Sequence, residues 1–320
     1  MKTVLHQLVL SSDEHFGNRL PPRHVGHLLA ELPLMVQQCV SMSLRNRSTA
    51  KGRAPEWLSR AADIRYVGHQ GDDQTELLFE APTLGDSASE IYEQKELFDE
   101  FSTRPSEKDT GFDLLGDVLC DVKSRNADSA HFDSPLLTRL TRFEKVFKKS
   151  PFHDLILTSR RHTKRKPACL SPSIIDSAKS LLGKTPASQR VRLVGQLDGI
   201  EASTQRFSVL LDTGEKVCGV FSDEQLDSIN ELWRQRVLVL GMAVYRPSGK
   251  LLRVDADEVT LTKETGQFFS AIPQPRRERF DLRETIRSQE QHKKGLAAII
   301  GKWPGDESDD EIASALKELS

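Results

Sequence analysis

The sequence predicts an α+β protein with an N-terminal mixed helix and strand domain, a small five-stranded β-barrel and a C-terminal helical tail. Apolar residues recur at helical spacing between residues 23 and 45, next to strand-like runs. Alternating apolar runs crowd residues 190–262, and charged residues of both signs are dense in residues 276–294. The length of 320 residues fits about two domains of roughly 150 residues each. We therefore divide the chain into a first domain, a linker, a barrel and a tail, at residues 1–150, 151–189, 190–262 and 263–320.

The first domain opens on a strand-like alternation at Lys2–Leu10. A long amphipathic helix is expected from Arg23 to Arg45, because its apolar residues recur every three or four positions and form one stripe. A hairpin follows, with Gln70-Gly71-Asp72-Asp73 as its turn. Helices are then expected in three segments, Ser89–Phe98, Asp113–Asn126 and Pro135–Lys149. This mixture predicts a few strands covered by helices, and it does not indicate which ligand, if any, the domain binds.

Two basic clusters stand out in this half of the chain. One surrounds a single loop of the first domain and comprises Arg45, Arg47, Lys51, Arg53 and Arg60. The other marks the linker, where five of the eight residues in Ser159–Lys166 are Arg or Lys and Pro167 follows. Such a stretch is most simply a solvated connection between domains. A short helix, Ile174–Leu182, is expected before the barrel begins.

Residues 190–262 follow the order of three strands, a helix and two more strands. The strands are expected at Val191–Ala202, Arg206–Leu211, Glu215–Phe221, Val237–Tyr245 and Leu251–Leu261. Gly214 allows the tight turn between the second and third strands, because glycine tolerates positive φ. Five strands with one helix between the third and fourth resemble an OB-type barrel, over about 70 residues. A small SH3-like barrel and a split β-sandwich fit the same pattern.

The resemblance to OB-type barrels implies binding of single-stranded nucleic acid. Such barrels pair cationic side chains with an aromatic stacking platform. The candidate residues in this sequence are Arg192, Arg206, Tyr245, Arg246, Lys250 and Arg253. Acidic residues such as Asp198 and Asp255 interleave with them, which weakens the electrostatic attraction that phosphate binding requires. A barrel that faces protein or is purely structural fits this mixed surface better.

The tail holds the strongest functional signal. From Trp303 to Leu319 it combines one Trp, a dense acidic stretch and an apolar face at helical spacing, and it resembles the C-terminal tails of small bacterial antitoxins that accompany PIN-domain ribonuclease toxins. The resemblance implies a peptide that docks on a protein partner, with the Trp as its aromatic anchor. An ordinary C-terminal helix folded on its own chain is the alternative. The candidate partner-binding residues are Trp303, Asp306, Glu307, Asp309, Asp310, Glu311, Ile312, Leu316 and Leu319.

The overall charge is close to neutral, with 45 Lys+Arg against 47 Asp+Glu and a formal net charge of −2. This balance excludes a globally basic nucleic-acid binder and an acidic solvating protein. No apolar run approaches the roughly 20 residues of a membrane span, and the start lacks the apolar core of a signal peptide. We expect a cytoplasmic, bacterial-type protein with no membrane association. Its cysteines form no CxxC pair and are expected as reduced thiols, at Cys39, Cys120, Cys169 and Cys218.

Motifs for catalysis are weak, and we expect neither enzyme activity nor a cofactor. Gly183-Lys184-Thr185 ends like a phosphate-binding loop, but Ala178 stands where the first glycine belongs, and a helix precedes the motif. His24 and His27 lie three residues apart near a helix start and lack a second pair of ligands, so no metal site is expected.

The leading hypothesis is a non-enzymatic, antitoxin-like protein whose tail binds and inhibits a partner such as a PIN-domain ribonuclease. The alternative is a single-stranded nucleic-acid-binding protein that acts through the barrel. A third hypothesis is a metal-dependent nuclease with Glu93 and Lys95 in its site. A solvated helix explains those two residues more simply.

Overall fold

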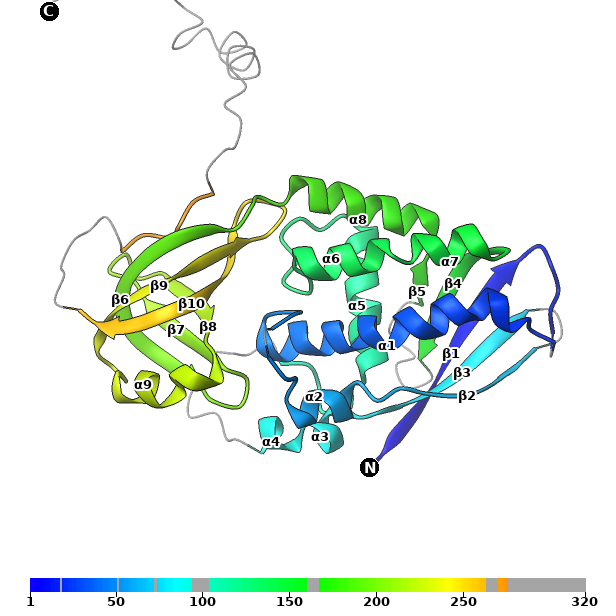
Figure 1. Cartoon of the computed structure of the whole chain (residues 1–320), viewed down its shortest axis with the longest axis horizontal. Helices are drawn as coiled ribbons and strands as arrows, with labels where there is room; N and C mark the ends of the chain where they lie inside the picture. The colour runs from blue at the N-terminus through cyan, green and yellow to red at the C-terminus, as the bar shows by residue number, and fades with distance from the viewer. Residues whose placement is uncertain are drawn as a thin grey trace, which may run out of the picture. The chain divides into compact units, whose positions relative to one another are not determined.

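The structure is a computed structural model that describes residues 1–17, 19–50, 52–71, 74–93, 104–159, 167–262 and 270–275 (Figure 1). With 35% of the described residues in helices and 33% in strands, the chain is an α+β protein, as the sequence predicts. It divides into a compact unit, Met1–Pro275, and a second unit, Arg276–Ser320, which lies wholly outside the described residues.

A five-stranded sheet underlies the first domain, in the order β2-β3-β1-β4-β5. Every adjacent pair of strands is antiparallel. The strands are β1 (Thr3–Ser12), β2 (Arg65–Gln70), β3 (Thr75–Pro82), β4 (Phe152–Ser159) and β5 (Ala168–Leu170). Successive side chains of a strand point to opposite faces, and in β1 the buried ones alternate accordingly at His6, Leu8 and Leu10.

β4 and β5 are formed by residues that the sequence pattern places in the linker. β4 pairs with β1, from His6 opposite Ser159 to Ser12 opposite Phe152. Leu155 and Leu157 of β4 are buried on the face that carries the core. The first domain therefore extends beyond residue 150, and the strong charge of residues 160–166 obscured the strand that precedes them.

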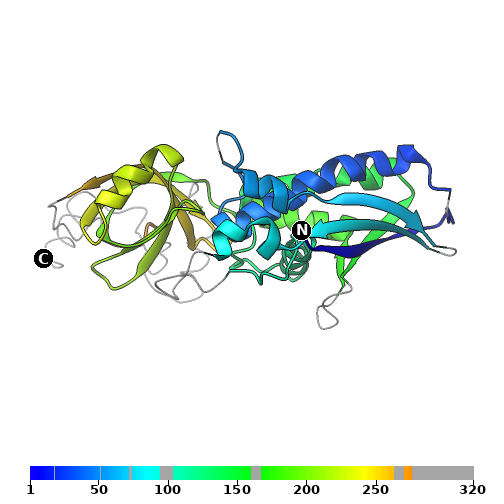
Figure 2. The same cartoon turned by 90° about the horizontal axis from the view of Figure 1, so that it is seen from below.

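Helices cover one face of this sheet, and Figure 2 shows α1 running along it. The helices are α1 (Pro22–Arg45), α2 (Glu56–Ala61), α3 (Leu84–Ser87), α4 (Ser89–Tyr92), α5 (Gly111–Lys123), α6 (Ser134–Thr141), α7 (Glu144–Lys149) and α8 (Pro172–Lys184). α1 matches the expected amphipathic helix almost to the residue. The single helix expected over Pro135–Lys149 is instead two helices, α6 and α7, with a break at Arg142-Phe143.

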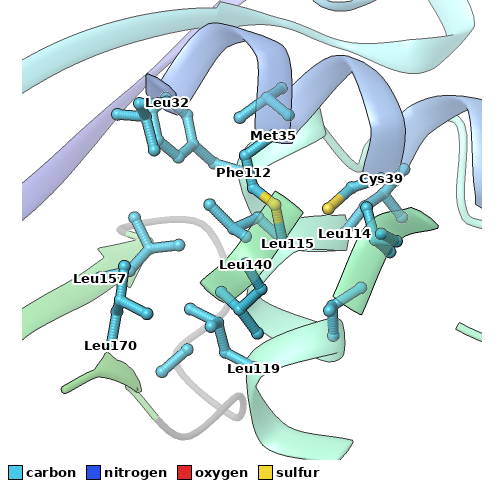
Figure 3. Packing of buried hydrophobic residues seen from close by; sticks show 14 of the residues in the cluster. Leu32, Met35, Cys39, Phe112, Leu114, Leu115, Leu119, Leu140, Leu157 and Leu170 are labelled. Atoms are coloured by element: carbon cyan, nitrogen blue, oxygen red, sulfur yellow. The ribbon is translucent and has the colours of Figure 1, made fainter. Parts of the chain in front are cut away.

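The core of the first domain lies between α1, α5 and the sheet (Figure 3). α5 begins in a capping box, in which the Thr110 hydroxyl accepts from the N–H of Asp113 and the Asp113 carboxylate accepts from the N–H of Thr110 at 2.9 Å. Burial raises the pKa of the Cys39 thiol on α1, so this cysteine stays protonated and serves in packing. The labelled core residues are Leu32, Met35, Cys39, Phe112, Leu114, Leu115, Leu119, Leu140, Leu157 and Leu170.

The second part of Met1–Pro275 is a closed five-stranded barrel with its own core. Its elements are β6 (Gln189–Glu201), β7 (Arg206–Leu210), β8 (Lys216–Val220), a 3₁₀ turn (Asp223–Gln225), α9 (Leu226–Glu231), β9 (Arg236–Tyr245) and β10 (Leu251–Leu261). Around the barrel the order is β6-β7-β8-β10-β9, and β9 closes back on β6. β8 and β10 pair in parallel, and the other neighbours are antiparallel.

Candidate functional site

The partner-binding residues predicted in the tail lie outside the described residues, as do Lys95 and the basic run 160–166. The tail residues concerned are Trp303, Asp306, Glu307, Asp309, Asp310, Glu311, Ile312, Leu316 and Leu319. Their role stays a prediction. The six nucleic-acid candidates of the barrel, by contrast, all lie in the described part of the chain, and most of them contact protein groups.

Arg253 of β10 forms an ion pair with Asp133 of the first domain. Its Nη1 lies 3.1 Å from Oδ2 of Asp133, and the two side chains are 4% and 0% exposed. Asp133 also caps α6 by accepting from the N–H of Leu136, and it accepts from the N–H of Ser48 at 3.1 Å. Arg253 is therefore enclosed between the first domain and the barrel, where no nucleic-acid phosphate can reach it.

Arg246 and Lys250 belong to the loop between β9 and β10, and both contact Asp128 of the first domain. Lys250 Nζ donates to Oδ2 of Asp128 at 2.9 Å, and Arg246 Nη1 donates to the Asp128 carbonyl oxygen at 2.6 Å. The N–H of Ser248 donates to the carbonyl of Ala127 at 3.1 Å. Hydrogen bonds from Ser248 and Lys250 hold the pKa of Asp128 below its usual value, so the carboxylate that Lys250 contacts is ionised at neutral pH.

Tyr245 does not offer the aromatic platform that single-strand binding requires. Its side chain is 1% exposed, and its hydroxyl accepts a hydrogen bond from the Gln189 amide. Val244 of β9 and Leu252 of β10 belong to the core of the first domain and not to that of the barrel. The buried position of Tyr245 corrects the stacking role expected from the sequence.

Arg206 lies in a second polar network, at the loop between β6 and β7. Its Nε lies 3.9 Å from Oε2 of Glu201, and Arg104 of the first domain forms an ion pair with Oε1 of the same carboxylate. All three side chains are largely buried. One glutamate of the barrel therefore bridges two guanidinium groups across the junction.

Gln205 extends this network toward the end of α1. Its Oε1 accepts hydrogen bonds from Arg45 and Arg47, both at or just after the last turn of α1. The β6–β7 loop and the β9–β10 loop thus both contact the first domain. Four of the six nucleic-acid candidates are held in or beside that junction by protein partners, and Tyr245 is buried next to it.

Arg192 is the candidate that lies elsewhere. It is exposed on β6 and lines a shallow groove of about 250 Å³ together with Arg190, Leu240 and Asp257. Arg190 Nη2 lies 3.5 Å from Oδ2 of Asp257, so the groove carries both signs of charge. None of the other five candidates lines this groove, and the structure therefore does not assemble the six into one site.

A pocket of about 180 Å³ at the end of α1 is a site that the sequence pattern did not reveal. The sequence marked the basic residues of this region but gave no sign of which ones surround a cavity. Arg60 instead forms ion pairs with Glu90 and Glu56, and Lys51 lies outside the described residues. The polar residues that line the pocket are Gln37, Gln38, Ser41, Arg45, Ser48, Thr49 and Arg53.

The described residues show no assembled metal centre. In the ranges that the structure covers, no group of three or more His, Cys, Asp and Glu side chains gathers in a geometry that could hold a metal ion. The His24 ring packs beside Phe16 and Phe152, with centroids 5.7 and 6.4 Å away. Gly183 and Lys184 belong to the last turn of α8, where the backbone forms helix hydrogen bonds and no phosphate-binding loop.

A scan against protein-family models, a search of curated proteins and a search of solved structures each returned no match to this chain. Among the helices that the structure describes, none combines the length and the apolar character needed to cross a membrane. A function for the chain must therefore be argued from its own residues.

Proposed function

We propose that the chain is a non-enzymatic, antitoxin-like binding protein, in which Met1–Pro275 is the folded body and Arg276–Ser320 carries the contact with a protein partner. The observation that carries this proposal is the division of the chain at Pro275, because the acidic, Trp-containing stretch falls entirely in the second unit. Between Lys302 and Glu318, two lysines stand against six carboxylates, a local net charge of −4. That composition suits a basic cleft on a partner, with Trp303 buried in a pocket beside it.

The folded body supports this proposal because cationic side chains of its barrel already contact polar groups of its first domain. The barrel residues that would attract nucleic acid instead contact carboxylates and carbonyls of the first domain, through Arg246, Lys250 and Arg253. Such a body gives the tail a folded attachment point. By resemblance of the tail, the partner class we favour is a PIN-domain ribonuclease, inhibited when the acidic stretch enters its active-site cleft.

We also propose that the barrel is of the OB type. Its five strands, with α9 between the third and the fourth, support this assignment. OB-type barrels bind ligands with the face of their second and third strands and with the loops between strands one and two and strands four and five. Here those two loops contact the first domain, at Gln205 and at Lys250. These contacts with the first domain compete with any ligand at the same loops, so we rank single-strand binding second.

Deletion of residues 276–320 tests the main proposal. The shortened chain should keep the circular dichroism and cooperative unfolding of the full chain, while the partner no longer co-purifies from the native host. Equal co-purification by both chains would contradict the proposal. The partner class is tested by titrating the full chain into a PIN-domain ribonuclease of the same genome, where RNA cleavage should fall as the complex forms.

The second-ranked function has an equally simple test. Fluorescence anisotropy with single-stranded oligonucleotides at low salt should show no binding by the full chain, because the loops of the barrel are occupied. Binding that weakens steeply with salt would reverse the ranking of the two functions.

A further inference from the structure

We propose that the pocket at the end of α1 binds a phosphate group, as inorganic phosphate or as the phosphate of a small phosphorylated compound. One wall is a single face of α1, since Gln37, Ser41 and Arg45 follow at intervals of four residues. Residues 48–50 and 52–54 form a second wall, and Leu58 of α2 adds an apolar surface.

Local interactions hold these two walls in place. Asn46 takes the left-handed conformation at the C-cap of α1 and turns the chain back on itself. The Ser41 hydroxyl donates to the carbonyl of Arg47 at 2.7 Å, and the N–H of Ser48 donates to Asp133. Gly52 has φ near +90°, a conformation that glycine adopts at no steric cost. The pocket is therefore a built feature of the first domain.

The chemistry of the lining favours an anion. Arg45 and Arg53 both line the cavity, whose described lining residues include no carboxylate. Arg45 keeps its positive charge while its Nη2 donates to the neutral amide of Gln205. Arg45 is 4% exposed and lies in the last turn of α1, where a cation offsets the negative end of the helix dipole. Arg53 comes from the loop and adds positive charge beyond what the helix end requires.

Neutral hydrogen-bonding groups complete the site. The buried Oε1 of Gln38 has no hydrogen-bond partner in the described structure. Because the two ends of a glutamine amide are exchanged by a simple flip, Gln38 can turn its NH₂ group toward an anion in the pocket. Thr49 adds an exposed hydroxyl. Phosphate offers several acceptor oxygens at tetrahedral angles, which suits the Arg53 guanidinium, the positive charge of Arg45 and the amide and hydroxyl donors.

The volume limits the size of the ligand. At about 180 Å³ the pocket is smaller than the roughly 300 Å³ at which sites for drug-sized ligands begin. A phosphate with a short organic group fits that space, and a whole nucleotide does not. The proposal concerns a separate site from the tail, and neither depends on the other.

Calorimetric titration of the full chain with inorganic phosphate and with glycerol 3-phosphate, at constant ionic strength, tests the proposal. We expect saturable binding that chloride does not reproduce, and the relative affinities of the two ligands show whether the site prefers free phosphate or the phosphate of an organic compound. Arg53→Gln should weaken that binding at least tenfold without changing the melting temperature of the unliganded chain, because Arg53 is exposed.

The matched control is Arg65→Gln, an exposed arginine of β2 that does not line the pocket and pairs with Asp63. It should bind phosphate like the parent chain. No saturable binding by the parent, or equal affinity in the parent and in Arg53→Gln, would overturn the proposal.

Discussion

Arg253 and Asp133 lie 120 positions apart in the chain and form an ion pair that is almost fully removed from solvent. The pair joins the last strand of the barrel to the N-cap of α6. Because Asp133 also accepts from Ser48, one carboxylate fixes a helix start, a loop and the barrel at once. This relationship helps to make Met1–Pro275 one compact unit instead of two independent domains.

Replacing Arg253 with Met should destabilise the body by about 3–5 kcal/mol, because it leaves the Asp133 carboxylate buried without its cation. Urea denaturation followed by circular dichroism measures the change in the free energy of unfolding. The matched control is Lys250→Met, since the ion pair of Lys250 with Asp128 is largely exposed and should contribute little to the free energy of unfolding. Equal effects of the two substitutions would contradict the proposal that the buried Arg253–Asp133 ion pair stabilises the body.

Gly219→Ala should destabilise the barrel by about 1–3 kcal/mol, because a methyl group there overlaps the ring of Phe207, its partner in the β7–β8 register. Gly183→Ala is the control. Gly183 lies in α8 with open space around it, so alanine should stabilise the helix by about 0.5–1 kcal/mol. Thermal unfolding of both variants measures the two effects, and a destabilising Gly183→Ala would show that this glycine has a role beyond the helix.

Asp212 makes the free energy of unfolding of the body depend on pH in the acid range. Hydrogen bonds from Arg236 and Ser270 lower the pKa of its carboxyl to about 2 in the folded chain, against about 3.9 in the unfolded chain. The unfolded state then binds more protons between these values, so the stabilisation is complete above about pH 4 and is lost as the pH falls toward 2.

Asp212→Asn should therefore lower the free energy of unfolding most at pH 5 and very little at pH 2. Urea denaturation at several pH values measures this difference, with the exposed Asp227→Asn of α9 as control. A difference between parent and Asp212→Asn that does not vary with pH would contradict the assignment.

Much of the fold could be predicted from local patterns. The stripe of α1 and the strands of the barrel repeat with periods that sequence alone reveals, and α1 and β9 appear within a residue or two of their expected bounds. β4 was missed because the charges of residues 160–166 outweighed the alternation of Leu155 and Leu157. The break between α6 and α7 also left no clear signal in the sequence.

The site was harder to predict because it depends on pairs distant in sequence. Arg246, Lys250 and Arg253 look like phosphate-binding residues until Asp128 and Asp133 are placed beside them. No local pattern shows which carboxylates will meet which cations. For the same reason, Arg53 could not be separated from Arg60, although one lines a pocket and the other forms ion pairs with Glu90 and Glu56.

The most direct test of the proposed function is a single substitution in the tail of the full chain. Trp303→Ala should abolish co-purification of the partner from the native host while the melting temperature of the body stays unchanged. Trp233→Ala, just after α9, removes a Trp from the body and should retain the partner. Loss of the partner in Trp303→Ala alone is the predicted result, and full retention of the partner by Trp303→Ala would contradict the proposal that this tail is the binding segment.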